Sequence, residues 1–359
     1  MSFEIVYTSS QRGLNAGARG FCTVAATTGI PRLLQEKLES LSGYQHLHTP
    51  GSKKNAVNFC CQAVRVQQET WIVLSRVADA GTDFSGRSNK IAHHLALSLS
   101  EVRSTNCPPT ALLADENFWY TKWTREPEWL PVDRMPTPVL SGGIPCNNWK
   151  KTFGDAGWAG IVARSVENDF ESVFAIVPEG CNALGLVNES LQQLPSKMHW
   201  KVSFSTYFTR SSGADCHWRF LRDGMEEATK VRNSPVGVVI DSNSRIDPQD
   251  EDSYVIAARS GKSRVARKPA PTEQSEKEGS FDRRPVTQSQ LRRREAGARA
   301  RQARLAPRVR PERQWEPDEL PEPQSAKPAG NRFRMWWISA GVLGVLLLTI
   351  FVVWLIAYK

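Results

Sequence analysis

The sequence lacks the short motifs by which many enzymes and nucleotide-binding proteins are recognised. It contains no GxxxxGK(S/T) phosphate loop, no GxGxxG dinucleotide fingerprint, no GxSxG nucleophile elbow and no HExxH zinc helix. The usual architectures of P-loop nucleotidases, dinucleotide-dependent dehydrogenases, α/β-hydrolases and zinc proteases are therefore not indicated. No internal repeat is visible either.

Paired cysteines and an export signal are also missing. The seven cysteines are an odd number, and they are scattered without a CxxC pair, which fits reduced thiols better than a disulfide framework. Residues 1–8 form a short strand-like run without a basic segment or an apolar stretch of useful length, so no secretory signal is visible. Both absences favour a cytoplasmic location for the part of the chain that folds.

The clearest positive feature is a run without charged residues from 335 to 358. As a helix it would rise about 36 Å, enough to cross a hydrocarbon layer of about 30 Å. Arg332 and Arg334 precede it, in agreement with the positive-inside bias. Near its two ends lie aromatic residues that favour the membrane–water boundary: Trp336, Trp337, Trp354 and Tyr358. We expect a single-pass, tail-anchored protein whose N-terminal domain is cytoplasmic.

The composition changes near Asp241. Residues 242–334 have little apolar periodicity and much Pro, Ser, Gln and charge, which cannot offset the entropy of ordering, so we expect a disordered linker rich in Arg and Pro. Within it, Arg283–Arg313 would be attracted to anionic lipid by about 1 kcal/mol per charge near the surface. A solvated spacer is the alternative. Nucleic acid is disfavoured as a partner, because no aromatic residues are interleaved to stack on bases.

Residues 1–241 have the pattern of an α+β globular head with a mixed sheet, either one domain or two subdomains. We place a first domain at 1–120 and a second α+β part at 121–241. Runs rich in β-branched and aromatic residues predict strands at 3–9, 20–28, 59–67, 70–78, 172–180, 199–209, 216–221 and 235–241. Helices are predicted at 31–43, 109–116 and 157–166. The pattern at 90–100 fits strand or helix, and 119–145 is predicted to be irregular.

The densest group of polar residues lies between Ser75 and Leu95. One interpretation is a phosphate or nucleotide contact in which Arg87 and Lys90 supply the charge and glycines allow close backbone approach. The other is a structural loop whose Asp and Asn side chains accept hydrogen bonds from turn amides. The members of the group are Asp79, Gly81, Asp83, Gly86, Arg87, Asn89, Lys90, His93 and His94.

The histidines and cysteines give weaker indications of chemistry. His93 and His94 are adjacent, so on a strand they face opposite ways and cannot bind one ion from one face; we predict no metal site. A nucleophilic enzyme needs a thiol or hydroxyl beside a base with an orienting group. Cys22 with His93 and Asp83 is the combination available, although Cys22 in an apolar strand is also typical of a small core residue.

Three strings resemble the N-terminal domain (type 2) of GTPase-associated proteins from predicted bacterial conflict systems. They are SSQRGLNAGARGFCTVAATTGIP, LESLSGY and SRVADAGTDFSGRSNKIAHHL. The resemblance covers about the first 120 residues. GDAGWAG at 154–160 and WKVSFSTYF…CHWR at 200–219 are similar to the region on the C-terminal side of that domain in related proteins. The resemblance implies an adaptor-like role beside a GTPase or another NTP-dependent effector. It implies no catalytic residues.

Taken together, the sequence predicts a membrane-tethered binding module that positions a protein partner such as a GTPase in a conflict or signalling system. No cofactor is predicted. The alternative is a hydrolase-like enzyme that uses Cys22 and His93. The residues expected to bind the partner are Arg19, Asp83, Arg87, Asn89, His93 and His94.

Overall fold

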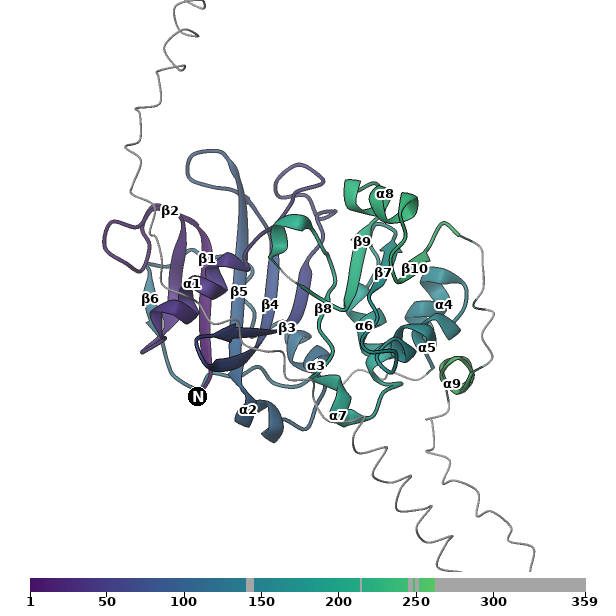
Figure 1. Cartoon of the computed structure of the whole chain (residues 1–359). Coiled ribbons are helices and arrows are strands. Elements are labelled where there is room, and N and C mark those ends of the chain that lie inside the picture. The colour runs from purple at the N-terminus through teal and green to yellow at the C-terminus, as the bar shows by residue number, and fades with distance from the viewer. Residues whose placement is uncertain (140–144, 214, 245–247, 249–251, 262–359) are drawn as a thin grey trace, which may run out of the picture. The chain divides into compact units, whose positions relative to one another are not determined.

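The computed structural model describes residues 1–139, 145–213, 215–244, 248 and 252–261, and these residues form an α+β head on one mixed sheet (Figure 1). The strands are β1 (Phe3–Ser10), β2 (Gly20–Thr27), β3 (Asn58–Val66), β4 (Glu69–Thr82), β5 (Ser88–Ser98), β6 (Glu128–Leu130), β7 (Val173–Val177), β8 (Phe204–Ser205), β9 (Trp218–Arg222) and β10 (Val238–Asp241). The helices are α1 (Arg32–Ser40), α2 (Leu99–Ser104), α3 (Pro109–Leu113), α4 (Asn147–Phe153), α5 (Gly157–Arg164), α6 (Ala183–Leu191), α7 (Ser196–His199), α8 (Glu226–Asn233) and α9 (Ser253–Ser260), with a 3-10 turn at Arg210–Ser212.

The sheet has an antiparallel half and a parallel half. Its strand order is β10-β7-β9-β8-β3-β4-β5-β1-β2-β6. The strands from β3 to β2 are antiparallel neighbours, whereas β10, β7, β9 and β8 run parallel to one another. The short strand β8 joins the halves, because it pairs antiparallel with β3 at Cys60 and Cys61 as well as with β9. Segments far apart in the sequence thus share one hydrogen-bonded sheet.

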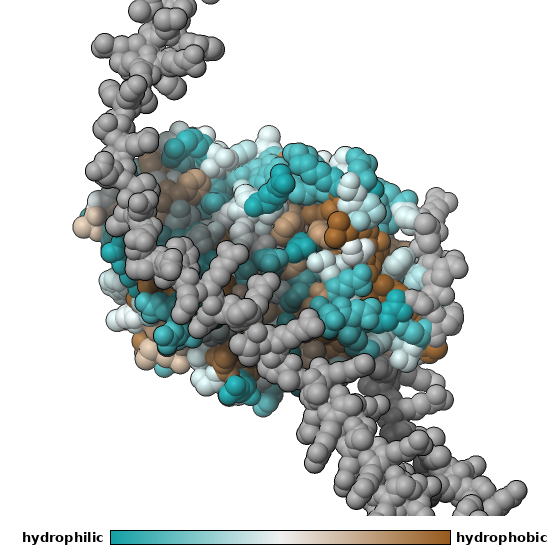
Figure 2. All heavy atoms as spheres, viewed as in Figure 1, coloured by the Kyte–Doolittle hydropathy of each residue, from teal (hydrophilic) through white to brown (hydrophobic). Residues whose placement is uncertain are grey.

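Strands β4 and β9 send alternate side chains to different cores. On β4, Ile72 and Leu74 belong to the large core under α3, α4, α5 and α6, whereas Trp71 and Val73 belong to the core under α1. On β9, Phe220 faces the first core and Leu221 faces a third core that includes Ala228 of α8. Helices therefore cover both faces of the sheet, and hydrophilic residues dominate the visible surface (Figure 2).

Most predicted elements are confirmed. β1 to β4 fall where β-branched and aromatic runs predicted them, and β3 and β4 form the expected antiparallel hairpin. α1 follows Pro31, with Leu34 and Leu38 buried. The ambiguous run 90–100 is mainly strand: Lys90–Ser98 lie in β5, and α2 begins at Leu99 after a Ser98–Glu101 capping box. Figure 1 shows β5 between β4 and β1.

Two local predictions were wrong. The strand predicted at 199–209 is reduced to Phe204–Ser205, because α7 ends at His199 and the Trp200 indole donates to the carbonyl of Cys107 instead of standing on a ladder. The connection 119–145 was predicted to be irregular, but its residues 128–130 form β6, which pairs parallel with β2. In both places a partner distant in sequence decides the conformation.

The folded head also extends past Asp241. α9 lies inside the range 242–334 that was predicted to be a disordered linker, and for these residues the prediction is corrected. Asp252 caps the helix, and Tyr254, Val255 and Ala258 are buried, so α9 gains the apolar packing that the surrounding composition lacks. Among the described residues, no helix is both long and apolar enough to cross a membrane. The predicted anchor at 335–358, with Trp336, Trp337, Trp354 and Tyr358, lies outside the described residues, as does Arg283–Arg313.

Candidate functional site

The turn between β4 and β5 is organised by Asp83. Its carboxylate accepts hydrogen bonds from the Ser85 hydroxyl at 2.7 Å, from the backbone N–H groups of Ser85 and Arg87 at 2.8 and 3.0 Å, and from the Ser9 hydroxyl at 2.9 Å. The bond from the Ser85 hydroxyl contributes most to holding the pKa of Asp83 well below its usual range. Asp83 thus serves the turn itself, as the structural interpretation of this segment predicted.

Asn89 ties β5 to β1. Its side-chain carbonyl accepts from the backbone N–H of Ser9 at 3.1 Å and from the Thr8 hydroxyl at 3.2 Å. Both Asp83 and Asn89 therefore hold the end of β1 against the β4–β5 turn. The two residues are brought together through Ser9, but neither presents a free carboxylate or amide oxygen for chemistry.

His94 is buried on the α1 face of the sheet. Its ring nitrogens lie 2.7 Å from the Ser75 hydroxyl and 2.9 Å from the Ser42 hydroxyl. Burial lowers the pKa of His94 to about 3, so the ring is neutral at physiological pH. A neutral imidazole with both nitrogens bonded to serines links the end of α1 to the centre of the sheet.

His93 points to the opposite face, as its position on a strand predicted, and joins a buried ionic cluster. The Tyr120 backbone N–H donates to its Nδ1, so its Nε2 carries the proton and donates to Glu4 at 2.8 Å. Arg134 donates to the same carboxylate, with Nε 2.8 Å from Glu4 Oε1, and its guanidinium lies over the Phe118 ring. Burial lowers the pKa of His93 against the opposing effect of Glu4.

The sequence did not reveal Glu4 and Arg134 as members of this cluster. They lie 89 and 41 positions from His93 along the chain, and only the pairing of β1 with β5 brings Glu4 to it. A glutamate between the apolar residues Phe3 and Ile5 of a predicted strand was the one sequence pattern that could have indicated the cluster. The cluster fastens the segment after β6 to the sheet.

The residues of the enzyme alternative, Cys22, His93 and Asp83, do not form a catalytic arrangement. The Cys22 thiol contacts the Gly20 carbonyl at 3.3 Å, and burial raises its pKa, which makes it a poor nucleophile. Both ring nitrogens of His93 are engaged by other groups. Among the described residues, no hydrogen bond joins Cys22, His93 and Asp83 to one another. Within that same part of the chain, no group of three or more His, Cys, Asp or Glu side chains is placed to hold a metal ion.

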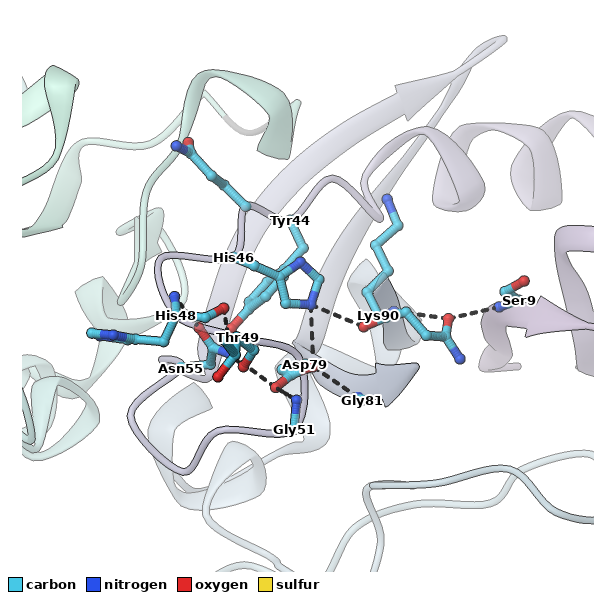
Figure 3. A network of polar contacts seen from close by, with 12 residues as sticks. Ser9, Tyr44, His46, His48, Thr49, Gly51, Asn55, Asp79, Gly81 and Lys90 are labelled. Atoms are coloured by element: carbon cyan, nitrogen blue, oxygen red, sulfur yellow. Dashed lines mark hydrogen bonds and ion pairs between the residues drawn. The ribbon is translucent and has the colours of Figure 1, made fainter. Parts of the chain in front are cut away.

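A second polar network surrounds Asp79 (Figure 3). Its carboxylate accepts from the Asn55 side chain at 2.9 Å, the backbone N–H groups of Gly51 and Gly81 at 2.6 and 2.8 Å, and His46 Nε2 at 3.1 Å. Burial would raise the pKa of Asp79, but these hydrogen bonds outweigh it and lower the pKa. His46, which lies beside a Pro-Gly turn in the sequence, thus anchors the loop before β3 to β4.

Two of the predicted binding residues remain at the surface, Arg19 before β2 and Arg87 in the β4–β5 turn. The Arg87 side chain is 64 % exposed although it pairs with Asp83. Phe21 and Phe84, two and three positions from these arginines along the chain, are 42 % and 51 % exposed. We call Arg19, Phe21, Phe84 and Arg87 the hairpin-end surface. It adjoins a hollow of about 400 Å³ whose lining includes Phe84 and the cations of the 122–125 segment.

Comparison with protein families gives two matches in succession. Residues 1–136 match the N-terminal domain, type 2, of GTPase-associated protein 1, and residues 146–243 match the middle domain of the same protein. The later similar strings at 154–160 and 200–219 lie inside the second match. Neither the comparison with curated proteins nor that with solved structures found a match. Because the two matches together cover more than half of the 359 residues, the chain belongs to the GTPase-associated protein 1 family.

Proposed function

We propose that this chain is a binding module that associates with a GTPase and positions it. The observation that carries the proposal is the succession of two domains named for association with a GTPase, over residues 1–136 and 146–243. The proposal includes a place in a bacterial conflict or signalling system, which rests on the resemblance of the first domain.

The chemistry of the head supports binding over catalysis. The Asp83 carboxylate, the side-chain oxygen of Asn89 and the rings of His93 and His94 are hydrogen-bonded to neighbouring strands and turns. A group that is saturated by the fold can shape a surface, but it has no free lone pair or proton for a substrate. The contribution of Asp83 and Asn89 to partner binding is therefore to hold the hairpin end rigid.

The hairpin-end surface is the contact we assign to the partner. It combines two exposed phenylalanine rings with two exposed guanidinium groups, and aromatic and arginine side chains contribute most to binding at protein interfaces. The Lys90 ammonium also lies 5.2 Å from the centre of the Phe21 ring. The complementary patch on the GTPase would carry carboxylates and an apolar depression.

We further propose that residues 335–358 anchor the chain in the membrane, with Arg283–Arg313 in weak contact with anionic lipid. The support is the uncharged run and its flanking aromatic residues. The head would then remain at the cytoplasmic surface. Confinement near a surface raises the effective concentration of head and partner without any new bond between them.

The experiment is co-purification of the tagged full chain from native membranes, with GDP or GTP present. A GTPase is expected to be enriched reproducibly. Arg87→Ala should reduce its recovery about tenfold, because an exposed interface charge is lost while the Asp83 turn keeps its backbone and Ser85 hydrogen bonds.

Arg32→Ala is the matched control, because Arg32 is also an exposed arginine paired with a carboxylate four residues away, on α1. It should leave recovery unchanged. If the Arg87→Ala and wild-type chains recovered the GTPase equally, the contact would not lie at the hairpin-end surface. Absence of any GTPase from the wild-type sample in both nucleotides would contradict the proposed function.

A further inference from the structure

Two adjoining hollows lie between the β3–β4 hairpin and the residues that lead into α6. The first, of about 590 Å³, is lined by Phe59, Arg76, Trp119 and others, and we call it the aromatic hollow. The second, of about 350 Å³, is lined by Lys53, Lys54, Glu179, Arg222 and others, and we call it the basic hollow. Both hollows share four lining residues, Val57, Phe59, Asn182 and Leu184. They therefore adjoin along one wall.

Arg76 is the unusual group in the aromatic hollow. It stands in the middle of β4 on the face covered by α3 and α6, and its Nη1 donates to the Tyr120 carbonyl at a long 3.5 Å. No ion pair involves it among the described residues, although the exposed Glu116 lies at the rim of the same hollow. Burial lowers the pKa of Arg76. A half-buried guanidinium that lacks a carboxylate has unused donors for a ligand.

The basic hollow has an excess of positive charge. Lys53, Lys54 and Arg222 face one carboxylate, Glu179, which pairs with Lys54 at 3.2 Å. Arg222 is half-buried, and the Pro178 carbonyl accepts from its Nη1. Lys53 is exposed and takes part in no ion pair among the described residues. Two cations are thus left without a carboxylate at the mouth of this hollow.

We propose that the two hollows form one binding site for a nucleotide. The phosphates lie in the basic hollow against Arg222 and Lys53. The base lies in the aromatic hollow against Phe59, where the guanidinium of Arg76 donates to its carbonyl or ring-nitrogen acceptors.

Shape and chemistry favour this ligand class. Each hollow falls within the range of about 300–1,000 Å³ in which small-molecule sites are found. Lys53, Lys54 and Arg222 line only the basic hollow, and the Phe59 ring lies on the wall that the two hollows share. The site lies between the two family domains, so an occupant would contact both. It is distinct from the hairpin-end surface and does not depend on a GTPase partner.

Equilibrium dialysis of the purified full chain against radiolabelled GTP and ATP tests the proposal. Saturable binding of at least one nucleotide with a Kd below about 1 mM is expected, with competition by unlabelled nucleotide. Lys53→Glu places a negative charge at the mouth of the basic hollow, and Arg222→Gln removes a phosphate contact. Each should weaken binding at least tenfold.

Lys53 is exposed, so its substitution leaves the fold intact, which a thermal unfolding curve verifies. Lys201→Glu is the matched control, because it reverses the charge of an exposed lysine that lines neither hollow. This variant should bind nucleotide as tightly as the wild-type chain. Unchanged binding in both Lys53→Glu and Arg222→Gln would overturn the assignment, as would the absence of saturable nucleotide binding. If pyrophosphate bound as tightly as the nucleotides, the base would contribute nothing to binding, and its placement in the aromatic hollow would be overturned.

Discussion

At the scale of single residues, the head is held by polar groups that the fold saturates. Glu4 is buried and receives hydrogen bonds from His93 and from Arg134. Such a carboxylate is stable in the interior because its partners replace the water it has lost. The cluster also joins β1 and β5 to the segment after β6, so its integrity determines whether that segment stays in place.

Arg134→Ala should therefore destabilise the protein strongly. Removing one partner leaves a buried carboxylate with only the neutral donor His93, and we expect a loss of about 3 kcal/mol in the free energy of unfolding, the low end of the usual range because Arg134 is partly exposed. Denaturant unfolding of the full chain, followed by near-UV circular dichroism, measures it. Arg32→Ala should change the value by less than about 0.5 kcal/mol. A similar small change for Arg134→Ala would show that the cluster is dispensable.

His94 makes stability depend on pH in the acidic range. The pKa is about 3 in the folded head and near 6.5 in an unfolded chain, so below pH 6.5 the unfolded state binds more protons. The stabilisation is complete above pH 6.5 and is lost as the pH falls toward 3, with a slope of about 1.4 kcal/mol per pH unit from this residue. His94→Gln, which has no titrating group, should show a shallower loss between pH 6 and 4. Identical slopes in the two proteins would refute the assignment.

The roles of these residues were predictable to different degrees. Asp83 lies in a turn, and turn chemistry is local, so acceptance from backbone amides was one of the two interpretations that the sequence offered. Asn89 lies on β5, and its bonds to Thr8 and Ser9 of β1 could not be read from the β4–β5 segment alone. The partners of His93 and His94 come from β1, from the end of α1 and from 120–134, and no spacing within the β4–β5 segment encodes them. Whether Arg19 and Arg87 bind a partner stays a prediction.

At the scale of elements, the packing of α9 against α5 requires a residue without a side chain at position 160 of α5. A Cβ at Gly160 would lie 2.5 Å from the carbonyl carbon of Tyr254 and 2.6 Å from the backbone nitrogen of Val255. Real Cβ atoms do not approach backbone so closely, so one helix would have to move. Ion pairs at both ends, Arg164–Asp252 and Arg259–Asp155, hold α9 in this position.

Gly160→Ala should loosen α9 from the head. We expect a loss of about 1–3 kcal/mol in the free energy of unfolding, with faster amide hydrogen exchange over residues 253–260. Mass spectrometry of exchanged peptides measures the local effect. Ile256→Ala, on the half-exposed side of α9, should leave the exchange of neighbouring amides nearly unchanged. Protection of α9 equal to wild type in Gly160→Ala would contradict this packing.

Elements with strong local patterns were predictable, whereas those stabilised by distant partners were not. Repeated leucines after Pro31 sufficed to predict α1. The alternation of Trp200, Val202 and Phe204 also fits a strand. In the structure the Trp200 indole donates to the Cys107 carbonyl instead, and only Phe204 and Ser205 pair with β3. α9 was missed because its few apolar residues stand in a polar stretch and are buried only through α5.

At the scale of the whole molecule, one sheet joins the two family domains. The composition predicted an α+β head with a mixed sheet, but the contact of β8 with β3 rests on two residue pairs that no sequence pattern distinguishes. The domain limits 1–120 and 121–241 stay predictions, as do the linker beyond α9 and the anchor.

Membrane attachment is testable on the intact chain. If residues 335–358 span the bilayer, alkaline carbonate washing should leave the full chain in the vesicle pellet, because a spanning helix is held by burial of apolar surface and not by charge. A chain truncated after Arg334 should be released into the supernatant by high salt, which screens any contact of the arginines with lipid. Release of the full chain by carbonate would exclude a spanning anchor.

The central claim is that the head binds a GTPase, and an equilibrium titration measures it most directly. The purified full chain would be titrated with the GTPase recovered by co-purification, loaded with GDP or with a non-hydrolysable GTP analogue, and followed by calorimetry. We predict saturable binding in at least one nucleotide state, about tenfold weaker for Arg87→Ala and unchanged for Arg32→Ala. No saturable binding in either state, from a chain with a normal unfolding transition, would contradict the account.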